Sequence, residues 1–316
     1  MEKTSVTLRI KVEPPFDFDL TAKSFSDEVA LCMRDEQICK YSDGKFWRIL
    51  RANDKLIFVV VKSIGDINNP ELEVQLTSSQ KISEGDKEII KKQVSSIFDL
   101  DSDLKSFYEA MQHDEFMSKM IDQLYGLKRA RSPNMFEALV YIILEQQISL
   151  QAAYNIEKRL IQKFGDRMQI DHKIYYAFPT PEKLASLEIK DLRPCGTSQR
   201  KSEYIRDIAK KIVEGQLDLE SLQQKDEEQM MEELCKLRGV GPWTAELTII
   251  RGAGKLRVIP AADLGLREHI ARYYFKDEGR KRVSSEEVRQ VAEGWGRWQG
   301  MAGYYAVVAG RLELEI

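Results

Sequence analysis

Polar and apolar residues alternate along two segments of the first hundred residues, 6–12 and 71–76, and a third segment, 55–62, is β-branched and apolar. Such segments are typical of strands that bury one or both faces. Ser83 then precedes apolar residues at helical spacing, with acidic residues in the first turn. The pattern predicts an antiparallel sheet that ends near residue 80 and is followed by a helix.

From about residue 102 the apolar positions recur at helical spacing almost throughout. The segment 132–137 places Pro133 where a first helical turn tolerates it, and the broad apolar face that follows predicts a central helix. The expected fold class is α+β. We expect residues 1–101 to form an N-terminal domain with an antiparallel sheet and helices, and residues 102–316 to form an all-helical domain.

Composition limits the class of protein. The 316 residues are 43% hydrophobic and 31% charged, which excludes disordered chains. The longest apolar run, 139–144, is far shorter than the ~20 residues of a membrane span, and the N-terminus lacks the apolar block of a secretory signal. We therefore expect an intracellular protein. Its four cysteines are scattered and form no CxxC pair, so we expect them to be reduced thiols: Cys32, Cys39, Cys195 and Cys235.

Charge is unevenly distributed, although the net charge is only -3. Residues 1–125 contain 17 basic and 23 acidic residues, whereas residues 126–316 contain 31 basic and 28 acidic residues. The second part is therefore the better candidate for nucleic-acid contact. Arg200 and Lys201, at the start of a predicted helix, are either phosphate contacts or part of a solvated helix face.

Two glycines that flank one apolar residue, Gly239, Val240 and Gly241, lie between two segments with helical periodicity. They allow a very tight turn between helices, and Pro242 favours the start of the second helix. Backbone N–H groups at such a helix start suit a phosphate oxygen. We predict a phosphate-binding hairpin that includes Thr244, although any tight helix-helix turn can contain the same glycines.

This segment resembles a helix-hairpin-helix motif, and the residues around it resemble the DNA glycosylase superfamily that is built on that motif. Asp263, in the stretch 258–266, stands at the position of the superfamily's catalytic aspartate. The segment 144–153 is similar to the loop that these enzymes push into the duplex. The resemblance covers most of 102–316 and is closest to the 3-methyladenine DNA glycosylase II family, whose N-terminal sheet domain also fits residues 1–100.

The resemblance implies roles for individual residues. Because a stacked base is inaccessible, such an enzyme rotates the nucleotide into a pocket. Gln147 and Ile148 match the wedge that fills the gap. Asp263 would stabilise the positive charge that develops on the sugar. Outside this context, an aspartate before a helix is usually only an N-cap.

Trp243 stands where strand-cutting members of the superfamily carry a lysine that forms a Schiff base. The tryptophan therefore predicts a monofunctional enzyme that uses water and leaves an abasic site. We expect Trp243, Tyr304 and Tyr305 to line the base pocket. At the family's further aromatic positions this chain has Leu247 and Val307.

The resemblance also implies a monovalent cation, Na⁺ or K⁺, held by the backbone carbonyls of Cys235, Leu237 and Val240, and no required cofactor. The expected partner is double-stranded DNA with damaged bases, bound by a monomer with no obligate protein partner and no membrane.

The predicted function is excision of alkylated purines of the 3-methyladenine type in base excision repair. One alternative is a helix-hairpin-helix protein that binds DNA without cutting it, which would not need a carboxylate at Asp263. Another is a glycosylase for a different lesion, such as oxidised guanine or a deaminated purine. A glycosylase/lyase is disfavoured by Trp243.

Overall fold

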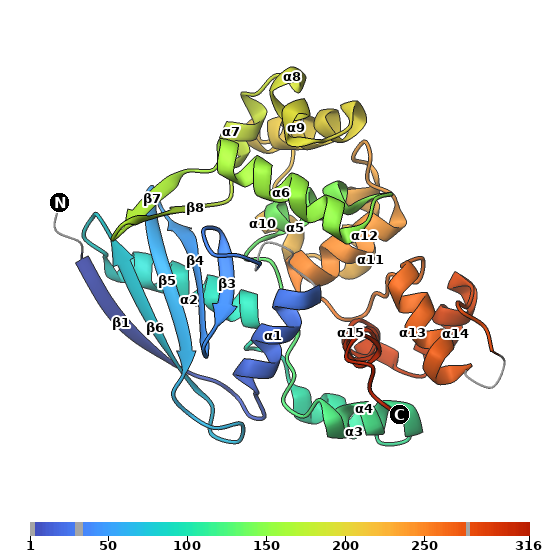
Figure 1. Cartoon of the computed structure of the whole chain (residues 1–316). Helices are drawn as coiled ribbons and strands as arrows, with labels where there is room; N and C mark the ends of the chain where they lie inside the picture. Colours follow the sequence, from blue (N-terminus) through green and yellow to red (C-terminus); the bar gives the residue numbers. More distant parts are fainter. Residues whose placement is uncertain (1–3, 29–33, 276–278) are drawn as a thin grey trace.

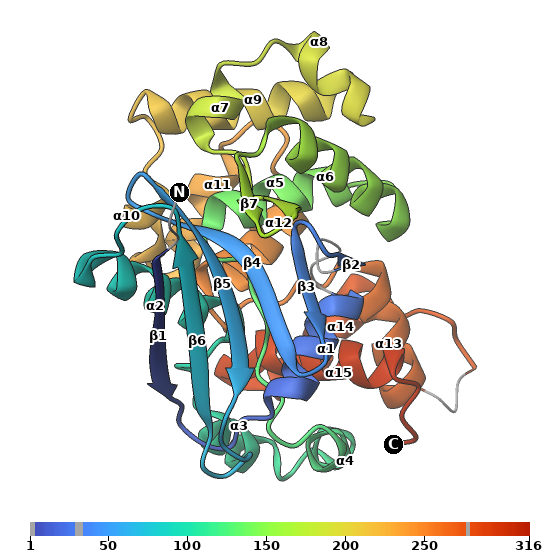
Figure 2. The same cartoon turned by 60° about the vertical axis from the view of Figure 1, so that its left-hand side comes forward.

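The N-terminal part of the chain is an antiparallel sheet in the order β1-β6-β5-β4-β3-β2. Figure 2 shows the strands side by side. The structure is a computed structural model and describes residues 4–28, 34–275 and 279–316. The three predicted strands are confirmed as β1, β5 and β6, and the hairpin of β3 and β4 was not predicted. The strands are β1 (Thr4–Lys11), β2 (Arg34–Asp35), β3 (Cys39–Ser42), β4 (Lys45–Ala52), β5 (Lys55–Ser63) and β6 (Glu71–Ser78).

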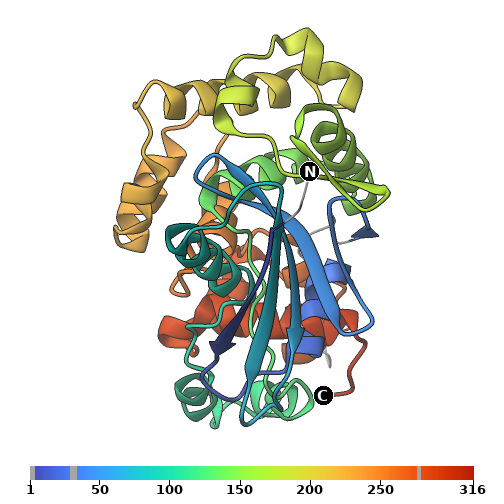
Figure 3. The ribbon, with the colours of Figure 1, turned by 90° about the vertical axis from the view of Figure 1, so that its left-hand side faces the viewer.

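Helices cover one face of this sheet, as Figures 1 and 3 show. The predicted helix after Ser83 is confirmed as α2, and its capping box joins Ser83 to Asp86. The helices are α1 (Phe18–Glu28), α2 (Glu84–Phe98), α3 (Leu104–Met111), α4 (Glu115–Gln123), α5 (Met135–Glu145), α6 (Leu150–Phe164), α7 (Pro181–Ala185), α8 (Ile189–Leu192), α9 (Gln199–Val213), α10 (Leu219–Gln223), α11 (Glu227–Cys235), α12 (Pro242–Thr248), α13 (Leu264–Tyr274), α14 (Ser285–Glu293) and α15 (Gln299–Arg311).

Helix α5 is central, as its apolar pattern predicted, because every one of its residues is buried. Its N-cap is Asn134, so Pro133 precedes the cap rather than lying in the first turn. Helix α12 is followed directly by one π-helical turn, Ile249–Ala253. Among the described residues, none of the helices combines the length and the apolar character of a membrane span.

The prediction that everything after residue 102 is helical is wrong in one place. Strands β7 (Arg167–Ile170) and β8 (Lys173–Tyr176) form a hairpin that packs on the opposite face of the sheet. The rings of Phe58 and Tyr175 lie 4.6 Å apart there. A strand of four residues is too short to show a clear alternation of polar and apolar residues in the sequence. The stability of this hairpin depends on its packing against the sheet, because an isolated two-stranded hairpin is only marginally stable.

The sheet shares a hydrophobic core with some of the helices, whereas α3, α4, α13, α14 and α15 pack in a second core. The largest cluster of buried residues extends from the sheet through α2 and α5 to α12, on both sides of residue 101. A buried ion pair crosses the same boundary: Arg48 on β4 donates to both oxygens of Glu137 on α5, at 2.8 and 3.1 Å. The boundary between domains at 101 and 102 stays a prediction.

Three of the four cysteines lie within the described residues, where Cys39, Cys195 and Cys235 are free thiols. The fourth, Cys32, lies outside them. This arrangement agrees with the expectation of reduced cysteines.

Candidate active site

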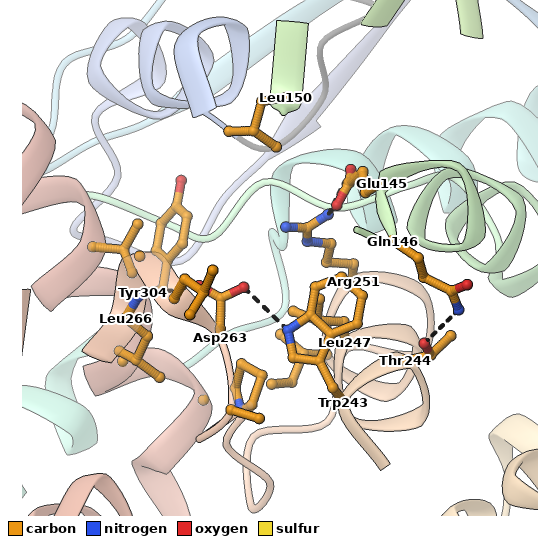
Figure 4. Close-up of a pocket in the computed structure, with 18 of the residues that line it drawn as sticks. Glu145, Gln146, Leu150, Trp243, Thr244, Leu247, Arg251, Asp263, Leu266 and Tyr304 are labelled. Carbon is orange, nitrogen blue, oxygen red and sulfur yellow. Dashed lines mark hydrogen bonds and ion pairs between the residues drawn. The ribbon is translucent and has the colours of Figure 1, made fainter. Parts of the chain in front are cut away.

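A cavity of about 990 Å³ opens where the end of α5, the start of α12, the start of α13 and the middle of α15 meet. Its volume lies at the upper end of the range of small-molecule pockets. Figure 4 shows Asp263 and Tyr304 on one side of this space and Trp243 and Arg251 on the other. Most of the predicted site residues therefore meet in one place, although they come from four separate elements.

The predicted hairpin is present between α11 and α12. Gly239 has a φ of +88°, and a Cβ at this position would lie 2.1 Å from the ring of Tyr204. Only glycine fits there, because both the backbone conformation and the space exclude a side chain. A Cβ on Gly241, the N-cap of α12, would meet no described atom, so this glycine leaves an open approach to the hairpin backbone.

Gln146 joins the hairpin to the end of α5. Its side-chain amide donates to the carbonyl of Gly239 and to Oγ1 of Thr244, both at 2.9 Å. Thr244 is itself buried, so its hydroxyl holds the two segments together. The predicted phosphate contact of the hairpin uses backbone N–H groups, not this hydroxyl, and stays a prediction.

Lys201 also acts inside the protein. Its Nζ donates to the carbonyls of Leu144 and Gln146, at 2.7 and 2.6 Å, and so caps the C-terminal end of α5. A cation at this end also opposes the negative pole of the helix. The sequence favoured a phosphate contact or a solvated helix face, and the side chain makes neither.

Asp263 is both a helix cap and a cavity residue. Its Oδ1 accepts a hydrogen bond from the backbone N–H of Leu266 at 3.0 Å, as the N-cap of α13. Its Oδ2 accepts from the indole Nε1–H of Trp243 at 3.1 Å. These two donors fix the position of the carboxylate in the cavity. The two alternatives that the sequence left open, cap and site residue, are thus compatible.

Trp243, which donates this hydrogen bond, lines the cavity. Leu247 and Val307 also line the cavity. Tyr304 lies there as expected, but the expectation for Tyr305 is wrong. Tyr305 is fully buried away from the cavity, and its hydroxyl donates to the carbonyl of Leu127 at 2.7 Å. Adjacent residues of a helix point about 100° apart, so only one of the two tyrosines faces the cavity.

Sequence reasoning missed four charged residues of the cavity: Arg129, Glu145, Arg251 and Arg311. Glu145 at the end of α5 pairs with Arg251, whose Nη1 lies 2.9 and 2.8 Å from the two carboxylate oxygens. Arg129, from the segment before α5, lines the same cavity. No spacing along the chain indicates this grouping, because 122 residues separate Arg129 from Arg251.

The predicted wedge residues stand at the mouth of the cavity. Gln147 is exposed and has a φ of +57°, a left-handed conformation that is uncommon outside glycine and clusters at functional sites. Ile148 is 38% exposed. Two further apolar side chains of the rim, Leu150 and Leu264, are 41% and 56% exposed and were not predicted. The rim therefore presents more apolar surface than the sequence suggested.

Of the predicted cation ligands, Leu237 and Val240 lie in the hairpin turn and Cys235 is the last residue of α11. Of the three carbonyls, that of Leu237 accepts a hydrogen bond from the N–H of Val240 at 3.0 Å. The cation stays a prediction.

Comparison with known proteins decides the family. Residues 140–296 match the HhH-GPD superfamily of base excision DNA repair proteins, and residues 33–139 match the N-terminal domain of 8-oxoguanine DNA glycosylase. A DNA-3-methyladenine glycosylase of Bacillus subtilis is 34% identical over 240 residues, which cover 76% of this chain and 78% of the relative. The chain belongs to the helix-hairpin-helix superfamily of DNA glycosylases. It is an enzyme that hydrolyses the N-glycosidic bond, and DNA is its partner.

One further relative and two solved structures are similar to this chain. DNA-3-methyladenine glycosylase 2 of Escherichia coli is 28% identical over 56% of this chain and 58% of its own length. The solved 3-methyladenine DNA glycosylase of Archaeoglobus fulgidus has a TM-score of 0.83 and 27% identity, covering 97% of this chain and 99% of its own. An 8-oxoguanine glycosylase/lyase of Clostridium acetobutylicum, at 23% identity and a TM-score of 0.72 over 97% of both chains, shares the fold.

Proposed function

We propose that this glycosylase is monofunctional and removes alkylated purines of the 3-methyladenine type from duplex DNA, leaving an abasic site for base excision repair. The observation that carries the proposal is the pairing of Asp263 with Trp243 at the cavity. It places a fixed carboxylate in the cavity and an indole where a Schiff-base mechanism needs an amine. Within the part of the chain that the structure describes, no lysine lines the cavity.

In the proposed reaction the bond between the sugar and the base breaks with positive charge developing on the sugar. The ionised Asp263 stabilises that charge and orients the attacking water. An alkylated purine leaves readily because methylation has already weakened its glycosidic bond. The names of the Bacillus subtilis and Archaeoglobus fulgidus relatives support this substrate class.

The rim and the hairpin supply DNA binding in this proposal. Gln147 and Ile148 enter the duplex where the nucleotide has left. The hairpin backbone at Gly239, Val240 and Gly241 approaches a phosphate, with a Na⁺ or K⁺ ion on the carbonyls of the turn. The chain acts as a monomer on DNA.

The test is release of free base from randomly methylated duplex DNA by the unmodified protein and by Asp263→Asn. Asparagine keeps the N-cap and the shape but removes the charge, so release should fall by about 100-fold or more while DNA binding persists. The matched control is Asp218→Asn, which changes an exposed N-cap of α10 that does not line the cavity.

Two outcomes would contradict the proposal. Equal release by Asp263→Asn and the unmodified protein would remove Asp263 from the reaction. A covalent enzyme-DNA adduct trapped by borohydride on 8-oxoguanine DNA, with no release of methylated purines, would replace it by a lyase for oxidised guanine.

A further inference from the structure

Arg251 reaches the cavity from the π-helical turn that follows α12. Such turns are rare and occur frequently at functional sites. The turn packs closely against α5, because a Cβ on Gly252 would lie 2.8 Å from the backbone of Met135. The carbonyl of Arg251 also accepts a hydrogen bond from the N–H of Ser132 at 2.9 Å. The backbone is therefore held in place, and the side chain of Arg251 points into the cavity across from Asp263 (Figure 4).

The guanidinium of Arg251 is only partly used within the protein. Its Nη1 donates to both oxygens of Glu145, and the side chain is 18% exposed. Within the described residues, Nε and Nη2 of Arg251 make no hydrogen bond, and unlike the nitrogens of Arg129 they are not buried. These two nitrogens therefore have free surface, and the cavity that Arg251 lines is where a ligand can reach them.

The positive charge of Arg251 is permanent at neutral pH. Burial lowers the pKa of Arg251, but the carboxylates of Glu145 and Asp263 outweigh this effect, so the pKa lies above the usual value of an arginine. The guanidinium therefore donates hydrogen bonds to a ligand and does not give up a proton. A ligand that benefits from this group presents acceptor atoms and gains negative charge.

The charge of the departing base separates two classes of lesion. A purine alkylated at a ring nitrogen, such as 3-methyladenine, is a cation in DNA and leaves as a neutral base when its glycosidic bond breaks. An uncharged purine, such as hypoxanthine, keeps the electron pair of the bond and leaves as an anion, which water protonates afterwards. A fixed cation beside the base stabilises the transition state of the second reaction and does not help the first.

We propose that Arg251 is a catalytic residue that donates hydrogen bonds to the departing base and stabilises the negative charge that an uncharged purine acquires. The inference rests on the proposed function, in which Asp263 acts on the sugar, and adds a group that acts on the base. The bond between the anomeric carbon and the base nitrogen breaks, its electron pair stays on the base, and water forms the new bond to the sugar. Glu145 holds the guanidinium in position.

The test compares the release of hypoxanthine and of 3-methyladenine from duplex DNA in single turnover. In Arg251→Met, which lacks the charge and the donors, the ratio of hypoxanthine release to 3-methyladenine release should fall about 10-fold or more, as expected for the loss of a hydrogen bond to a charged group. Arg251→Lys keeps the charge and should lower the ratio less. A double variant, Glu145→Gln with Arg251→Gln, leaves no stranded carboxylate and should lower the ratio as Arg251→Met does.

The matched control is Arg289→Met. Arg289 pairs with the buried carboxylate of Glu246 at 2.7 Å, much as Arg251 pairs with Glu145, but neither Arg289 nor Glu246 is among the described residues that line the cavity. Arg289→Met should leave the ratio unchanged. A general loss of stability would slow the release of both bases alike, whereas the proposed role changes their ratio.

The outcomes distinguish this inference from the proposed function. An unmodified protein that releases no methylated purine contradicts the proposed function, and the inference with it. An unmodified protein that releases 3-methyladenine but no hypoxanthine contradicts the inference alone. The same ratio in the unmodified protein, in Arg251→Met and in the double variant also overturns the inference, because Arg251 would then be a structural residue of the cavity wall.

Discussion

Buried charged side chains occur in two regions of this molecule, and the two regions differ in the hydrogen-bond partners of these side chains. Where the sheet meets α5, Arg48 and Glu137 are both almost fully buried and hydrogen-bonded to each other, and the hydroxyl of Tyr141 donates to the same carboxylate at 3.1 Å. At the cavity, Arg251 is hydrogen-bonded to the carboxylate of Glu145, whereas Arg129 has only the charge of Asp99 nearby and no hydrogen-bonded carboxylate. A charge that holds elements together has its partner within the fold.

The largest expected effect is at the junction of sheet and helix. Glu137→Ala leaves Arg48 buried without its carboxylate, so the free energy of unfolding should fall by about 3–5 kcal/mol. Denaturant unfolding measures it. Glu73→Ala, which breaks the partly exposed pair with Lys62 on the sheet, should cost less than about 1 kcal/mol. Equal losses would mean that burial of the Arg48 pair is unimportant.

The second prediction has the opposite sign. Arg129→Met removes an unsatisfied buried cation, so the free energy of unfolding should rise by about 1–3 kcal/mol. The same substitution at Arg48 should lower it, because the buried carboxylate of Glu137 would be stranded. Parallel thermal and denaturant unfolding of the two variants measures the difference. If both variants are destabilised, the contrast between the two regions fails.

Trp243 tests how far the carboxylate of the cavity depends on its neighbour. Trp243→Phe keeps an aromatic ring but removes the hydrogen bond to Asp263. A hydrogen bond to a charged group contributes about 1.5 kcal/mol, so single-turnover base release should slow about 10-fold. Unchanged release would show that the N–H of Leu266 positions Asp263 sufficiently. Tyr175→Phe, on the far face of the sheet, is the control for an altered aromatic residue.

The smallest expected effect concerns the end of α5. Lys201→Met removes the cap on the carbonyls of Leu144 and Gln146 and should lower the free energy of unfolding by about 1 kcal/mol. Arg200→Met removes the neighbouring exposed charge and should leave stability within about 0.5 kcal/mol. If the two variants instead weaken DNA binding equally and leave stability unchanged, Lys201 is a phosphate contact after all.

Much of the site was predictable because its signals are local. The glycines of the hairpin, Pro242 and the position of Asp263 lie within 25 residues of one another, and each has a conformational or chemical reason that is visible in the sequence. The start of α2 after Ser83 and strands β1, β5 and β6 were predictable for the same reason. Their residue patterns match the backbone geometry that they adopt.

Tertiary structure decided what depends on residues far apart in the chain. Periodicity shows that α15 is apolar on most sides, but only its packing determines that Tyr304 faces the cavity and Tyr305 faces the core. The β7–β8 hairpin exists because the sheet covers it.

The sequence by itself determined the fold class, the hairpin and the carboxylate of the site, since these depend on local backbone preferences and on motif spacing. The charge environment of the cavity was decided by the tertiary structure. Whether a buried arginine is paired depends on which side chains the fold brings within about 4 Å of it. That is why Arg129, Arg131 and Arg251, which look alike in the sequence, differ in the folded molecule.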